Sequence, residues 1–288
     1  MVATSIDSLS VDAKHPQVVF AAANGRVFRS TDGAQSWSET GPAGETLSTV
    51  VVSPGNGQRV FAAGLDGVFV SSNRGSTWRP SGLRDALVTL LAVSPRNARV
   101  VYAGTFLDVF RSDDGGRTWR QSGLHGNWVQ SLVLSSRNPR IAVAAVFAKS
   151  AKLFGTVDGG RSWKPVQVPF RRDYVTGLAA DPRNPTVVYM TAVGGIYKGS
   201  FTGGRWQKLG GDLIGTDSLL VDPRRPGVLY AGGLLDGVSR STNGGRTWKA
   251  FNRGLSKNNS VVSLAADATG RVLYAGTYGG GVFDYRFR

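Results

Sequence analysis

The stretch SDDGGRTW, residues 112–119, decides the fold of this chain. Ser112 and Asp114 carry side-chain oxygens that accept hydrogen bonds from backbone N–H groups of their own turn. Gly115 and Gly116 supply the positive φ angles that a tight turn needs. Trp119 then adds a large apolar surface that is expected to be buried beneath the turn. The octapeptide is therefore predicted to staple a hairpin to the sheet behind it.

Variants of this octapeptide recur along almost the entire chain, and each one ends in tryptophan. The tryptophans are Trp37, Trp78, Trp119, Trp163, Trp206 and Trp248. The steps between them are 41, 41, 44, 43 and 42 residues. A period of this size is typical of stacked supersecondary units.

Within a repeat, short apolar runs alternate with Gly, Pro, Asn and Asp pairs, which is the pattern of short strands joined by tight turns. In the third repeat the expected strands are 88–93, 100–103, 109–112 and 118–121. No segment carries a sustained helical period. The chain is therefore predicted to be all-β, a seven-bladed β-propeller of four-stranded antiparallel blades.

All 288 residues are assigned to this single propeller domain. A seventh unit starts at Val261 and lacks the octapeptide, so the last blade is expected to be incomplete. The blades are expected at approximately 5–41, 47–83, 87–124, 128–168, 174–210, 214–255 and 261–288.

Composition narrows the function classes. Zero cysteines exclude disulfides and thiolate metal sites, and with only His15 and His125 no metal site is expected. No cofactor motif appears, and no apolar run is long enough for a membrane span. The formal charge of +15 favours anionic partners or surfaces. We expect a monomer.

The repeats resemble those of Asp-box propellers, whose signature Ser-x-Asp-x-Gly-x-Thr-Trp residues 112–119 match completely. The variants at 71–78 and 241–248 have Asn in the acidic position, 156–163 and 30–37 depart at one or two positions, and 200–206 is one residue short and lacks the acid. The resembling family includes sialidases, xyloglucan-cleaving hydrolases, sortilin-type receptors and photosystem II assembly factors. It favours a secreted or periplasmic location, although no signal peptide is visible.

The strand order assigns the loops to two faces. The octapeptide turns share one face, which we call the octapeptide face, with the turns after each first strand, and the remaining loops form the opposite face. Many arginines are expected on the octapeptide face: Arg96, Arg99, Arg117, Arg137, Arg140, Arg161, Arg183, Arg224, Arg225 and Arg246. One interpretation is that these arginines form a surface for anionic ligands. The alternative is that they are solvated turn residues, which recur only because the turn itself is repeated. Nucleic acid is not expected, because no exposed aromatic platform lies among them.

The opposite face carries the candidate ligand site. Its loops differ most between repeats, and aromatic, basic and polar side chains converge over blades three to five. The candidate ligand-binding residues are Phe106, Asp108, Trp128, Phe147, Arg171, Arg172 and Tyr174. An apolar patch with a few oriented polar groups is typical of a ligand or partner site. The alternative is that Trp128 and Tyr174 begin inner strands and pack inward.

Two functions stay open on the sequence. The chain has only Glu39 and Glu45 as glutamates, which argues against a sialidase. A glycoside hydrolase needs two carboxyl groups about 5 to 9.5 Å apart, and Asp108 with Asp173 or Asp85 is the best available pair. The leading hypothesis is a non-catalytic module that binds a protein or a polysaccharide on the opposite face. The alternative is a hydrolase acting on a polysaccharide.

Overall fold

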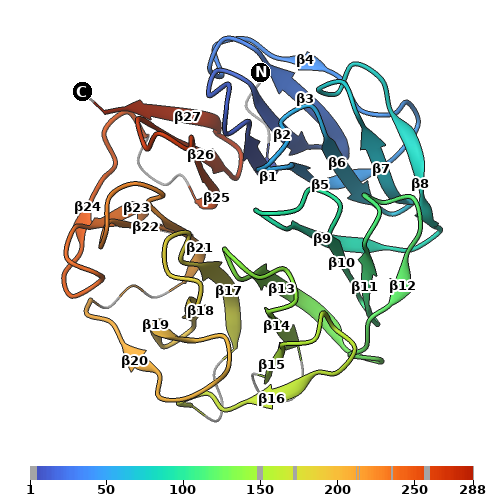
Figure 1. The fold of residues 1–288 in the computed structure, drawn as a ribbon. Helices are drawn as coiled ribbons and strands as arrows, with labels where there is room; N and C mark the ends of the chain where they lie inside the picture. Colours follow the sequence, from blue (N-terminus) through green and yellow to red (C-terminus); the bar gives the residue numbers. More distant parts are fainter. Residues whose placement is uncertain are drawn as a thin grey trace.

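The computed structural model describes residues 5–147, 152–170, 174–211, 213, 215–234, 236–255 and 260–287. Seven antiparallel sheets are arranged around a central axis, with the first strand of each sheet nearest the axis (Figure 1). The predicted seven-bladed β-propeller is confirmed. Among the described residues no helix occurs that is able to cross a membrane.

Six blades are four-stranded meanders and the last has three strands among the described residues. The first three blades contain β1 Ile6–Val11, β2 Val19–Ala23, β3 Arg26–Ser30, β4 Ser38–Glu39; β5 Leu47–Val52, β6 Val60–Gly64, β7 Gly67–Ser71, β8 Arg79–Arg84; and β9 Val88–Val93, β10 Val101–Thr105, β11 Val109–Ser112, β12 Arg120–Gln121. The next two contain β13 Trp128–Leu134, β14 Ala142–Phe147, β15 Lys152–Thr156, β16 Lys164–Val166; and β17 Val175–Ala180, β18 Val187–Ala192, β19 Gly195–Ser200, β20 Gln207–Lys208. The last two contain β21 Thr216–Val221, β22 Leu229–Gly233, β23 Gly237–Ser241, β24 Lys249–Ala250; and β25 Val261–Ala266, β26 Val272–Thr277, β27 Gly281–Arg286.

The ring closes by packing of the seventh blade against the first. Ile6, Val19 and Tyr274 belong to one buried apolar cluster that joins the two blades. The backbone N–H of Leu9 also donates to the hydroxyl of Ser263 at 3.0 Å. Side-chain packing and the hydrogen bond to the Ser263 hydroxyl therefore contribute to closing the ring. No strand of the first blade pairs with the sheet of the seventh among the described residues, because each sheet contains consecutive strands only.

The octapeptide turn has the hydrogen bonds that the sequence predicts. In residues 112–119 the Ser112 hydroxyl accepts from the N–H of Gly116 at 2.8 Å, and the Asp114 carboxylate accepts from the N–H of Arg117 at 2.9 Å. Gly115 and Gly116 have φ of 79° and 84°. The N–H of Gly115 donates to the carbonyl of Arg99 at 2.8 Å, which places the turn after the first strand on the same face.

The octapeptide tryptophans are less buried than the sequence suggests. All six are partly buried and pack against the edges of the apolar clusters rather than inside them. The reason is their position beside the short outer strand, beyond which no further layer covers the ring. Most of the fully buried aromatic rings among the described residues come from the second strands instead, such as Phe20 and Phe61. A Cβ atom on Gly116 would lie 3.3 Å from the Phe61 ring, so this ring lies directly beneath the turn of the next blade.

The octapeptide carboxylates predict how stability depends on pH. Hydrogen bonds from Ser36 and from Ser162 hold the pKa values of Asp32 and Asp158 well below the usual range. For Asp114, burial acts in the opposite direction but hydrogen bonds from Thr118 outweigh it, so its pKa is also lowered. A carboxylate whose pKa is lower in the folded state than in the unfolded state stabilises the fold when the pH is above the unfolded-state pKa. This stabilisation is lost as the pH falls below about 4, because the carboxylate is then protonated.

We therefore expect Asp114→Asn to flatten the acid side of the stability profile, measured as unfolding temperature between pH 7 and pH 2.5. Asn73 is the matched reference, because its amide oxygen already accepts from the N–H of Thr77 at 2.9 Å without a titrating proton. A variant whose acid limb is as steep as that of the unmodified protein would contradict this account.

Candidate functional site

Four aromatic side chains form a continuous strip on the opposite face over blades three to five. Phe106 stacks on Trp128 with ring centroids 4.8 Å apart, Trp128 meets Phe147 at 5.4 Å, and Phe147 stacks on Tyr174 at 5.5 Å. We call these four residues the aromatic strip. Phe106, Phe147 and Tyr174 are between 42% and 46% exposed, so much of each ring is open to a ligand.

The strand register explains why these rings meet. Trp128 begins β13 and pairs with Phe147 at the end of β14, so the antiparallel ladder sets the two side chains opposite each other. Phe106 lies in the turn after β10, and Tyr174 immediately precedes β17. Both turns meet blade four on the same face. Trp128 and Tyr174 thus lead into inner strands, as the alternative interpretation states, but their rings pack along the surface strip.

Asp108 lies next to the strip in the same turn as Phe106. Its Oδ1 atom is 2.5 Å from Nδ1 of His125, and its backbone N–H donates to the Thr105 hydroxyl at 2.9 Å. The Asp108 side chain is 17% exposed, whereas the His125 ring is 66% exposed. The turn therefore fixes the backbone of Asp108, and the His125 imidazole contacts its carboxylate.

The remaining predicted residues are of two kinds, three that lie outside the described residues and one that lies in another turn. Arg171, Arg172 and Asp173 lie outside the described residues. Asp85 is exposed in the turn between β8 and β9, where its φ is 53°. The candidate carboxyl pair for hydrolysis thus stays a prediction, and the described half of it is an aspartate bound to a histidine.

A second carboxyl pair, which the sequence argument missed, lies on the opposite face of blade two. The pKa of Glu45 is raised, first by burial and then by a hydrogen bond and repulsion from Asp66, while Arg84 opposes the shift. The Asp66 carboxyl group thus lies near enough to Glu45 to disfavour the charged form of Glu45. Only the folded turn brings them together, because 21 residues of sequence separate them.

Exposed apolar residues are concentrated on the opposite face. Ten large apolar side chains among the described residues are strongly exposed, and topology places nine of them in opposite-face loops. The nine are Leu65, Leu87, Phe106, Leu107, Phe147, Tyr174, Val193, Leu234 and Tyr278. Val157, in an octapeptide, is the exception. Clustered exposed apolar residues typically mark an interaction surface.

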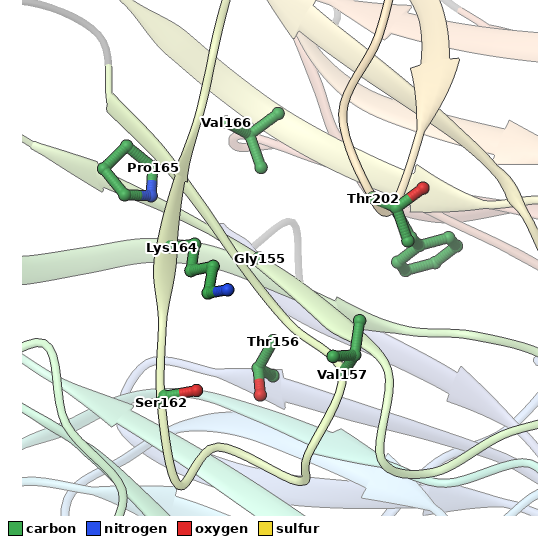
Figure 2. A pocket seen from close by; sticks show the side chains of 9 residues that line it. Gly155, Thr156, Val157, Ser162, Lys164, Pro165, Val166 and Thr202 are labelled. Carbon is green, nitrogen blue, oxygen red and sulfur yellow. The ribbon is translucent and has the colours of Figure 1, made fainter.

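Hollows in the described part of the octapeptide face include one at the central channel and one at blade four. An apolar cavity of about 420 Å³ occupies the end of the central channel, lined by the last residues of β1, β5, β17, β21 and β25. A smaller pocket of about 220 Å³ lies beside the octapeptide of blade four, and Figure 2 shows Lys164 pointing into it near Thr156. The shortened turn at 200–206 forms one wall with Phe201 and Thr202. This pocket is smaller than the usual ligand site.

The chain resembles known propeller structures, but no family model and no curated protein matches it. An ancestral GH74 enzyme superposes with a TM-score of 0.83 at 19% identity, covering 100% of this chain and 45% of the enzyme. The chain therefore spans under half the length of that enzyme.

Two further structures superpose at similar quality. YCF48 bound to D1 peptide has a TM-score of 0.74 and 15% identity, covering 100% of this chain and 95% of YCF48. The extracellular domain of the two-component system BT4673 from B. thetaiotaomicron has a TM-score of 0.78 and 14% identity, covering 99% of this chain and 38% of that one. At these identities the likenesses show the fold alone, which is that of a seven-bladed propeller.

Proposed function

We propose that this protein is a non-catalytic binding module that holds an extended protein or glycan chain on the opposite face, over blades three to five. The observation that carries the proposal is the aromatic strip, because four rings in contact across three blades form a rigid apolar platform. Aromatic anchors bury large areas at low entropic cost and dominate many binding interfaces.

Further observations support a binding role. Asp108 and His125 flank the strip with polar groups that can fix the orientation of a ligand. The wider distribution of exposed apolar residues on the same face favours a partner larger than a small molecule. YCF48, a propeller of similar size, is seen with a peptide bound. We further propose that the repeats belong to the Asp-box group and that the protein acts outside the cytoplasm.

The test is a binding screen of the unmodified protein against cello-oligosaccharides, xyloglucan oligosaccharides and a displayed peptide library, with affinity measured by calorimetry. We expect one ligand to bind without being cleaved, and Trp128→Ala to weaken it about tenfold through loss of a central ring.

Tyr278→Ala is the matched control. Tyr278 is 72% exposed on the same face, at the turn between β26 and β27, and lies outside the strip. Its removal should leave the affinity within about twofold. Equal losses for the two variants would show that the strip has no special role.

A hydrolase is the second candidate, favoured by the TM-score of 0.83 with the GH74 enzyme. In that case the same glucans release reducing sugar, and Asp108→Asn abolishes the release while the thermal unfolding curve is unchanged. Release of sugar would overturn the non-catalytic proposal, whereas binding without release supports it.

A further inference from the structure

Arg59 departs from the repeat in a way that neither the fold nor the opposite face explains. When the repeats are aligned on the residue that matches Phe61, the position two residues earlier is apolar and β-branched in the other blades, as in Val18, Val100 and Val228, which are at most 8% exposed. In blade two this position holds an arginine, half-buried just before β6. Replacing a buried valine with a guanidinium removes apolar packing and brings a charge into the joint between blades two and three.

The Arg59 guanidinium covers the first glycine of the next octapeptide. A Cβ atom on Gly115 would collide with Nη1 of Arg59. Arginines from the preceding blade cover the equivalent glycines in two other places: Arg111 covers Gly159, and Arg286 covers Gly33. The three arginines therefore cover the same position of the octapeptide, although Arg59 precedes β6, a second strand, whereas Arg111 and Arg286 lie on the third strands β11 and β27.

Two of these three arginines have an aspartate beside them and Arg59 does not. Arg111 pairs with Asp113, and Arg286 pairs with Asp284 at 3.0 Å. In both cases the acid lies two residues away along the chain. The corresponding neighbours of Arg59 are Gly57 and Phe61. In the described part of the chain, the Arg59 guanidinium takes part in no hydrogen bond and no ion pair.

Further positive charge surrounds this unpaired group. Burial lowers the pKa of Arg59, and the charges of Arg79, Arg117 and Arg99 lower it further. These three arginines come from the start of β8, the octapeptide of blade three and the turn before β10. Their own guanidinium groups also take part in no hydrogen bond or ion pair within the described residues. The backbone places two of them beside Gly115, because the carbonyl of Arg99 accepts from the N–H of Gly115 at 2.8 Å and Arg117 lies two residues further along the chain. Four cations thus gather at one joint between blades.

The Asp114 carboxylate also acts on Arg59, but it is already occupied by hydrogen bonds of its own turn. Its two oxygens accept from the N–H of Arg117 at 2.9 Å, from the hydroxyl of Thr118 at 2.6 Å and from the hydroxyl of Ser112 at 2.8 Å. These bonds hold the octapeptide turn together. The cluster therefore keeps an excess of about three positive charges with unused N–H donors.

We propose that Arg59, Arg79, Arg99 and Arg117 form a preorganised site for a tetrahedral oxyanion, a sulfate or phosphate group. Guanidinium groups bind such anions through paired N–H donors, and a doubly charged oxyanion offsets repulsion that no protein acid offsets here. This site is on the octapeptide face and is independent of the aromatic strip.

The test measures unfolding temperature while sodium sulfate, sodium phosphate or a sulfated disaccharide is titrated, with sodium chloride at matched ionic strength as the reference. The chloride reference removes the general effect of screening the repulsion. We expect each oxyanion to raise the unfolding temperature above the chloride value. A larger shift with the sulfated disaccharide indicates a sulfated glycan as the natural ligand. A larger shift with phosphate indicates a phosphate group.

Arg59→Val restores the residue type of the other repeats, so it is expected to fold and to be at least as stable in low salt. It should weaken oxyanion binding roughly tenfold or more. Arg117→Gln removes a second cation of the site from an exposed position, so it should also weaken oxyanion binding while leaving the buried packing of the joint unchanged. Arg246→Gln removes the same charge from the matching octapeptide position of blade six and should keep the full response. An unchanged response in Arg59→Val, or an equal loss in Arg246→Gln, overturns the site.

Discussion

Phe61→Ala should cost about 3–5 kcal/mol of unfolding free energy, because it removes a fully buried ring from a close-packed joint. Phe61 lies on β6, opposite Val70 on β7, and its ring supports the octapeptide turn of blade three beneath Gly116. The cavity would open between two blades, where rigid sheets relax little. Urea denaturation of the variant and the unmodified protein measures the difference.

Two variants control this measurement. Phe61→Leu keeps most of the volume and should cost less than about 1.5 kcal/mol. Tyr278→Ala removes an exposed ring and should stay within about 0.5 kcal/mol. A loss below about 1 kcal/mol for Phe61→Ala would mean that the octapeptide turn does not depend on the ring below it.

Asp222→Ala should also cost about 3–5 kcal/mol, because it removes one partner of a largely buried ion pair. Asp222 is 1% exposed, and its carboxylate lies 2.8 Å from Nη2 of Arg225. It also accepts from the N–H of Arg224 at 2.9 Å. Arg225 in turn donates to the carbonyl of Gly270 at 2.7 Å and lies 4.1 Å from the Phe287 ring centroid. The pair thus joins blade six to the three-stranded blade seven.

Two further variants separate the cost of leaving Arg225 unpaired from the cost of losing the side-chain acceptor in the turn. Asp222→Ser keeps a side-chain acceptor, as Ser94 does in blade three, where its hydroxyl accepts from the N–H of Arg96 at 3.3 Å. It should restore part of the loss. Adding Arg225→Met to Asp222→Ala should restore another part by removing the unpaired charge. If Arg225→Met gives no recovery, the cost of Asp222→Ala comes from the turn alone.

The sequence predicts the parts of this molecule that repeat. The 41–44 residue period specifies the blades, and the glycines and acids of the octapeptide specify its turns. The contacts between Trp128 and Phe147 could also be anticipated, because an antiparallel pair sets the start of one strand beside the end of the next. These features depend on local pattern and strand order, which are visible along the chain.

The parts that were missed depend on contacts between units. The sequence around Glu45 does not indicate that Asp66 lies near it. The sequence around Arg59 does not indicate that its guanidinium covers Gly115. Nothing in the sequence next to Asp222 indicates that its side chain is fully buried. One signal was available for Arg59, because aligning the repeats shows a cation at a position otherwise apolar. The burial of the tryptophans was overestimated because the sequence does not show that the outer strand has no cover.

The exposed apolar loops and many of the arginines lie on opposite faces of the propeller. This separation gives the molecule a preferred orientation next to a charged surface. Near a negatively charged surface, a torque turns the arginine side downward once the gap falls to about one Debye length, roughly 10 Å. Adsorption would then leave Phe106, Trp128, Phe147 and Tyr174 pointing away from the surface. Retention by charge and capture by rings can thus occur at the same time, without either ligand displacing the other.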